Sequence, residues 1–278
     1  MNRSIKNLEK YAIAFLILTL VGVVCRCISL FEFYDSDIGY YKTAALLPKV
    51  FHLLSVLSVV FALFSVLFLP KLTADLYITP KSDSLGARIA AVFPMAGVLS
   101  FLVYSFISAS GESTSDFGTV VTNKAGEIVS VLVLVFGVLA VMYFILVCLG
   151  KTTKGDGHVL FGYAVILFVL MVLANSYFDF HTTMNSPNKL LSQTTLMSLM
   201  LYMLFELRFS LGNAAPRGYA AFSLSAFYLT AVNSIPGIIA FSAGILYKPE
   251  YLMSDLLTLT FSVYVAVRFT MYIKSQKI

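Results

Sequence analysis

Eight apolar runs, each long enough for a membrane-spanning helix of about 20 residues, constrain this chain more than any other feature of its sequence. Unpaired backbone groups are costly in lipid, so a chain crosses a bilayer as helices or as a closed barrel. The runs cover residues 11–32, 50–69, 88–109, 128–149, 159–179, 190–209, 220–246 and 254–273. The sequence therefore predicts an all-α, polytopic transmembrane helical bundle, with residues 1–278 forming a single integral membrane domain.

The composition excludes a soluble protein. Only 12% of the residues are charged, against roughly 25% in a soluble globular domain. The basic residues behind the net charge of +5 lie in short loops between apolar runs, so no nucleic-acid partner is predicted. The three cysteines lie inside apolar runs and the three histidines in separate segments, so no metal site and no cofactor is predicted.

The basic residues also predict an orientation. With the N-terminus in the cytoplasm, most of the 19 Lys and Arg residues fall on the cytoplasmic side, as the positive-inside rule requires. An even number of spans returns the C-terminus to the same side. The first run reads as a signal anchor that stays in the protein, and the short loops favour a bacterial plasma membrane. The lysines left outside are Lys42, Lys49, Lys124, Lys189 and Lys248.

The two halves of the chain, residues 1–149 and 150–278, resemble each other. An offset of 140 residues places Lys49 on Lys189 and Ser58 on Ser198. Four spans per half would form a parallel 4+4 internal repeat, related by an axis along the membrane normal. The alternative is that hydroxyl residues at helical spacing are ordinary packing in membrane interiors.

Arg26 lies inside the first apolar run, where a charge costs about 2.5 kcal/mol or more at mid-bilayer. One interpretation is that its side chain snorkels to the outer headgroups. The other is that it faces a polar pocket and pairs with Glu32, Asp35 or Asp179.

Polar residues gather where the fifth run ends and the sixth begins. Asn175 and Gln193 lie inside these two runs, and Asp179 and His181 lie at their outer ends. The side chains either join helices by hydrogen bonds or line a vestibule at the outer side of the membrane.

Three further runs carry polar residues. His52 begins a polar face of the second run, and Glu206 ends a polar stripe of the sixth, where it is a candidate proton or ion site. In the seventh run, Asn233 precedes Pro236 and Gly237 near mid-membrane. This pattern is typical of a broken helix at a transport site, although Pro and Gly also serve packing in membrane spans.

Together these features predict a small secondary transporter or permease subunit for a small polar or anionic solute. The alternative is a non-transporting sensor or scaffold subunit of a larger membrane complex. A membrane-embedded lipid-modifying enzyme has few residues in its favour, so an enzyme is not expected. The expected partners are the lipid bilayer, the solute, and membrane proteins or a second copy of the chain. The predicted solute-binding residues are Arg26, His52, Asn175, Asp179, Gln193 and Asn233.

Overall fold

The chain is an all-α bundle, as predicted. The computed structural model describes residues 2–36, 38–42, 44–68, 84–110, 124–150, 156–178, 186–213, 215–246 and 248–275. Within these ranges the strands β1 (Tyr34–Asp35) and β2 (Tyr40–Tyr41) pair antiparallel as a hairpin between the first two helices. The helices are α1 (Asn2–Phe33), α2 (Leu46–Phe68), α3 (Leu85–Ser110), α4 (Lys124–Cys148), α5 (Asp156–Phe178), α6 (Pro187–Ser210), α7 (Pro216–Ser242) and α8 (Pro249–Ser275).

The eight helices in the described part of the chain are each long and apolar enough to cross a membrane. They coincide with the eight predicted runs. Helix α1 begins nine residues before its run, and each of the others begins three to five residues before its run. Hydrogen bonding within a helix continues into the headgroup layer, so the helix outlasts its apolar stretch. Proline occupies the first position of α6, α7 and α8, where its missing N–H leaves no intrahelical bond unmade.

Six helices form a closed ring. Each of α3 to α8 packs against the next in chain order, and α8 packs back against α3. Helices α1 and α2 lie outside this ring, and both pack against α7. As a result α7 has neighbours on most sides and is the most buried helix.

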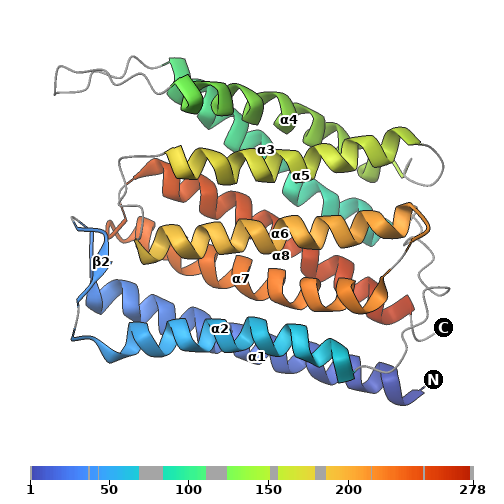
Figure 1. The fold of residues 1–278 in the computed structure, drawn as a ribbon, viewed down its shortest axis with the longest axis horizontal. Helices are drawn as coiled ribbons and strands as arrows, with labels where there is room; N and C mark the ends of the chain where they lie inside the picture. The colour runs from blue at the N-terminus through green and yellow to red at the C-terminus, as the bar shows by residue number, and fades with distance from the viewer. Residues whose placement is uncertain are drawn as a thin grey trace.

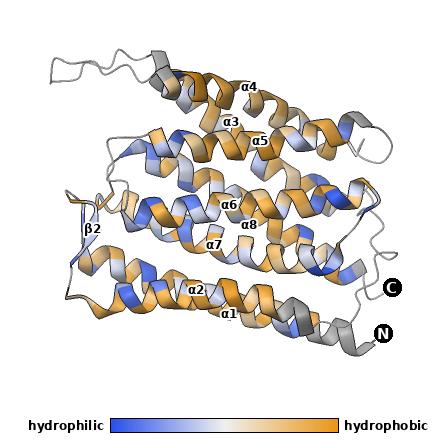
Figure 2. Ribbon diagram, viewed as in Figure 1, coloured by the Kyte–Doolittle hydropathy of each residue, from blue (hydrophilic) through white to orange (hydrophobic). Residues whose placement is uncertain are grey.

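The helices run along one common direction, and both chain ends lie at the same end of the bundle (Figure 1). We call this the terminus end, and the opposite end, which carries β1 and β2, the hairpin end. Large exposed apolar side chains are concentrated on α1 to α4, while hydrophilic residues are more frequent along α6 to α8 (Figure 2). The apolar surface is the one that lipid would cover.

Small residues allow the helices to approach closely. A Cβ added at Gly97 of α3 would overlap Thr260 of α8, and one at Gly162 of α5 would overlap Leu207 of α6. Membrane helices associate by such close packing, because lipid removes the hydrophobic drive to associate.

The predicted 4+4 repeat would pair α1 with α5 and α3 with α7. Under that exchange the contact of α1 with α7 would correspond to a contact of α5 with α3. In the described residues α1 packs against α7, whereas α5 packs against α4 and α6, so the packing is not symmetrical. The helix packing lends the repeat no support, and it stays a prediction.

Candidate functional site

A cavity of about 560 Å³ lies at the hairpin end of the six-helix ring. Side chains from α3, α4, α5, α6 and α8 line it, so it sits inside the ring and away from α1 and α2. Three of its lining residues carry charge, namely Glu127 at the start of α4, Lys189 at the start of α6 and Glu250 at the start of α8. The cavity therefore presents both signs of charge at helix N-termini.

Lys189 is the buried member of these three. It is 5% exposed, whereas Glu127 and Glu250 are exposed. Its backbone N–H donates to the side chain of Ser186, which caps the N-terminus of α6. The helix dipole disfavours a cation in this first turn, so helix stability alone does not explain the placement of Lys189.

Asn175 and Gln193 join the helices on one side of the cavity. Ser130 of α4 donates to Asn175 Oδ1 at 3.4 Å, and Gln193 Nε2 donates to Ser176 Oγ at 3.3 Å. Asn175 also lines the cavity. The two interpretations of the sequence are thus compatible for Asn175, which both joins helices and faces the vestibule, while Gln193 joins α6 to α5.

Arg26 does not snorkel to the membrane surface. Its side chain is 2% exposed and one guanidinium nitrogen donates to Val232 O, Asn233 O and Asn233 Oδ1 at 2.8 to 3.0 Å. The snorkelling interpretation is wrong because α7 offers oxygens closer than the headgroups. Its predicted carboxylate partners Glu32 and Asp35 are replaced by carbonyl and amide oxygens, and Asp179 lies outside the described residues.

Pro236 explains why the carbonyl oxygen of Val232 can accept a hydrogen bond from Arg26. In a helix the carbonyl of residue i−4 accepts from the N–H of residue i, and proline has no N–H. Pro236 lies inside α7, so the carbonyl of Val232 is left without its helical donor. Arg26 supplies the missing hydrogen bond. The break predicted at this point does not occur, since α7 continues from Pro216 to Ser242.

Asn233 connects Arg26 to a buried carboxyl group on α8. Its Nδ2 donates to Asp255 Oδ1 of α8 at 3.0 Å while its Oδ1 accepts from Arg26. Asp255 is 7% exposed. Gly237 makes room for it, because a Cβ there would overlap the Asp255 carboxylate. The amide of Asn233 thus bridges the guanidinium of Arg26 and the carboxyl group of Asp255. We call Arg26, Asn233 and Asp255 the Arg26 network.

Asp255 is not among the solute-binding residues that were predicted from the sequence. Helix α8 begins at Pro249, so Asp255 lies in its second turn and its side chain points to α7 instead of capping α8. The signal available in the sequence was a carboxylate inside an apolar run.

His52 lies beside the Arg26 network on α2. It is half-buried, its ring lies 6.0 Å from that of Tyr41, and Arg26 is its main charged neighbour. Tyr41, in β2, also accepts a hydrogen bond from Arg26. Burial raises the pKa of the Tyr41 phenol, and the charge and hydrogen bond of Arg26 oppose that rise. The hairpin thus covers the outer side of Arg26 with a neutral hydroxyl.

The predicted solute-binding residues form two groups. Asn175 and Gln193 lie at the cavity, and Arg26, Asn233 and His52 lie at or beside the Arg26 network. The first turn of α6 joins the groups, because Asn188 accepts from Arg26 at 3.4 Å and the next residue, Lys189, lines the cavity.

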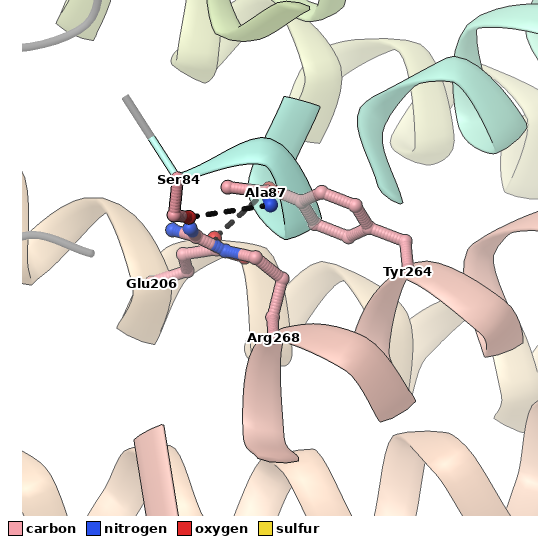
Figure 3. A network of polar contacts seen from close by, with 5 residues as sticks. All are labelled: Ser84, Ala87, Glu206, Tyr264 and Arg268. Carbon is pink, nitrogen blue, oxygen red and sulfur yellow. Dashed lines mark hydrogen bonds and ion pairs between the residues drawn. The ribbon is translucent and has the colours of Figure 1, made fainter. Parts of the chain in front are cut away.

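Glu206 lies away from both groups, toward the terminus end. Its Oε1 accepts from Arg268 Nε at 2.6 Å and from Tyr264 OH at 2.9 Å, both on α8 (Figure 3). Ser84, which directly precedes α3, and Ala87 of the first turn of α3 appear beside them in the same view. Arg208, two residues further along α6, does not take part in this contact and donates to Asn213 O. Glu206 is 3% exposed, and its Oε2 has no hydrogen-bond partner among the described residues.

No group of three His, Cys, Asp or Glu side chains in the described ranges is arranged to hold a metal ion. Comparison with known protein families, curated proteins and solved structures finds no match to this chain.

Proposed function

We propose that the chain is a small membrane permease, or the solute-binding subunit of one, that takes a small polar solute into the cavity at the hairpin end. The observation that carries this proposal is a buried lysine in a cavity inside the helix ring, next in sequence to the asparagine that touches Arg26. Ionisable groups in membrane spans are costly, and they commonly mark solute or ion pathways.

The charges of the cavity favour a zwitterionic solute over a simple anion. Glu127 and Glu250 would repel a solute that carries negative charge alone, whereas Lys189 attracts a carboxylate. A solute with one ammonium and one carboxylate group satisfies both signs. The volume lies within the roughly 300–1,000 Å³ of small-molecule sites, so a free α-amino acid fits the description.

Thermal unfolding of the purified protein in detergent tests this proposal. The probes are free amino acids, their N-acetyl derivatives, which lack the cation, and their amides, which lack the anion. A ligand that binds only the folded state at 100 times its dissociation constant stabilises it by about 2.7 kcal/mol. We expect stabilisation by one or more free amino acids and by neither derivative.

Lys189→Ala should abolish that stabilisation. Lys49→Ala is the matched control, because Lys49 also lies in the first turn of a helix but is exposed on α2, outside the ring. Stabilisation that survives Lys189→Ala, or the absence of any effect across the probes, would contradict the proposal. The second result would favour the non-transporting sensor or scaffold.

The charge asymmetry of the loops supports an orientation with the terminus end in the cytoplasm and the cavity facing outward. The lipid-modifying enzyme depends on Asp179 and His181, which lie outside the described residues.

A further inference from the structure

Glu206 belongs to a buried polar cluster near the terminus end of the ring. Tyr202 and Tyr264 are fully buried, and the side chain of Arg268 is 11% exposed. The ion pair joins α6 to α8, which are separated in the ring by α7. We call Glu206, Arg268, Tyr264, Tyr202 and His158 the Glu206 cluster.

The hydrogen bonds of this cluster are one-sided. Both donors of α8 reach Oε1 of Glu206, and Oε2 receives none from the described residues. Tyr202 OH and His158 Nε2 are also buried without a hydrogen-bond partner in the described part of the chain. Buried polar atoms are nearly always paired, so three such atoms near one carboxylate call for an explanation.

The neighbours of Glu206 define what could bind there. It interacts electrostatically with His158 of α5, with Tyr202 on its own helix, and with Tyr264 of α8. Tyr219 of α7 and Tyr143 of α4 lie within reach of these tyrosines. Arg268 is the one cation that these interactions include, and it already holds Oε1. The other unpaired polar atoms of the cluster are the hydroxyl of Tyr202 and Nε2 of His158, and neither is hydrogen-bonded to Oε2.

We propose that Glu206 is a proton-binding site. The carboxylate takes one proton from water at the terminus end and becomes a carboxylic acid, while Arg268 keeps its proton and no other bond is made or broken. The proton would sit on Oε2, the carboxylate oxygen that receives no hydrogen bond from the described residues. Protonation also removes the charge that holds Arg268 to α6.

This site deepens the proposed permease function. Its coupling to solute transport rests on that function. Proton uptake loosens the contact between α6 and α8 at the terminus end, opposite the cavity. A proton gradient would then drive the solute through the ring. Proton binding itself needs no solute and is tested separately.

Infrared difference spectroscopy of the full-length protein in lipid, titrated from alkaline to acidic pH without solute, tests the proton site. Wild type should show the carbonyl band of a buried, protonated carboxyl group, and Glu206→Gln should lose one such band. Glu32→Gln, at the exposed end of α1, should retain it. If Glu206→Gln does not fold, Glu206→Asp replaces it and should move the band in frequency. A spectrum unchanged by either variant would overturn the proposal.

Proteoliposomes test the coupling with the amino acid that stabilises the protein. Glu206→Gln should abolish accumulation driven by a pH gradient and leave solute exchange between the two sides. Gradient-driven accumulation equal to wild type would overturn the proposal. If no amino acid binds but the infrared band depends on Glu206, the proton site stands and the permease proposal falls.

Discussion

Arg26 and Pro236 form a pair that neither residue explains alone. A proline in a helix interior frees a carbonyl oxygen, and a buried arginine needs acceptors, so each supplies what the other lacks. Arg26 could be recognised from the sequence as a costly charge. Its acceptors could not, because Val232 lies 206 residues away and its carbonyl is ready only when α1 packs against α7.

Arg26→Met should destabilise the protein more in the wild-type background than in Pro236→Ala. Hydrogen bonds to charged groups contribute about 1.5–3 kcal/mol, and alanine in place of Pro236 would return an N–H to Val232 O. We expect a coupling of about 0.5–3 kcal/mol in the double-mutant cycle, measured by unfolding in mixed detergent micelles followed by circular dichroism.

Pro94→Ala is the matched control for this cycle. Pro94 is also buried inside a helix, but that helix is α3, on the far side of α8 from α7. The change in unfolding free energy caused by Pro94→Ala should add to that caused by Arg26→Met, without coupling. Equal coupling for both prolines would contradict the role of Pro236.

At the scale of elements, the apolar runs predicted all eight helices because spanning a bilayer leaves few choices of backbone structure. They predicted neighbours poorly, since a polar residue in a span shows only that a partner exists. Gln193 and Asn175 illustrate this, because each contacts a serine of an adjacent helix that nothing in its own run identifies.

Gly237→Ala should destabilise the contact between α7 and α8. The added methyl group would overlap the Asp255 carboxylate, and overpacking in a dense interior costs about 1–3 kcal/mol. Thermal unfolding in detergent should show a lower melting temperature than wild type.

Gly86→Ala gives the comparison for that prediction. Its Cβ would meet nothing nearer than Met271 Sδ at 3.8 Å, and alanine is favoured over glycine in a helix. Its melting temperature should equal or exceed that of wild type. Equal losses in both variants would show that the crowding at Asp255 is not the cause.

For the whole molecule, the even number of spans predicted that both chain ends lie together, and the bundle has this arrangement. The grouping of the site residues could not be predicted, because it depends on how α3 to α8 close into a ring. Glu206 shows the limit clearly. Its partner Arg268 is 62 residues away, and nothing in the sequence around Glu206 identifies that partner.

The proposed orientation of the bundle predicts which cysteines a membrane-impermeant thiol reagent reaches in intact cells. In a variant without Cys25, Cys27 and Cys148, Ser192→Cys lines the cavity and should be labelled from outside. Ser84→Cys, at the start of α3, should be labelled only after the cells are permeabilised. The reverse pattern would place the terminus end outside.

The long separation between Arg26 and its acceptors affects how the protein is made. Synthesis at about 5–20 residues per second leaves α1 in the membrane for roughly 10–40 s before the 206 residues up to Val232 have followed. During this interval the arginine has no α7 to bind. We expect its side chain to snorkel to the headgroups during this time. The snorkelling interpretation of the sequence, which is wrong for the folded protein, would then describe the nascent chain. Insertion of α7 would then draw α1 to its final depth, which makes the seventh helix the step that completes the placement of the first.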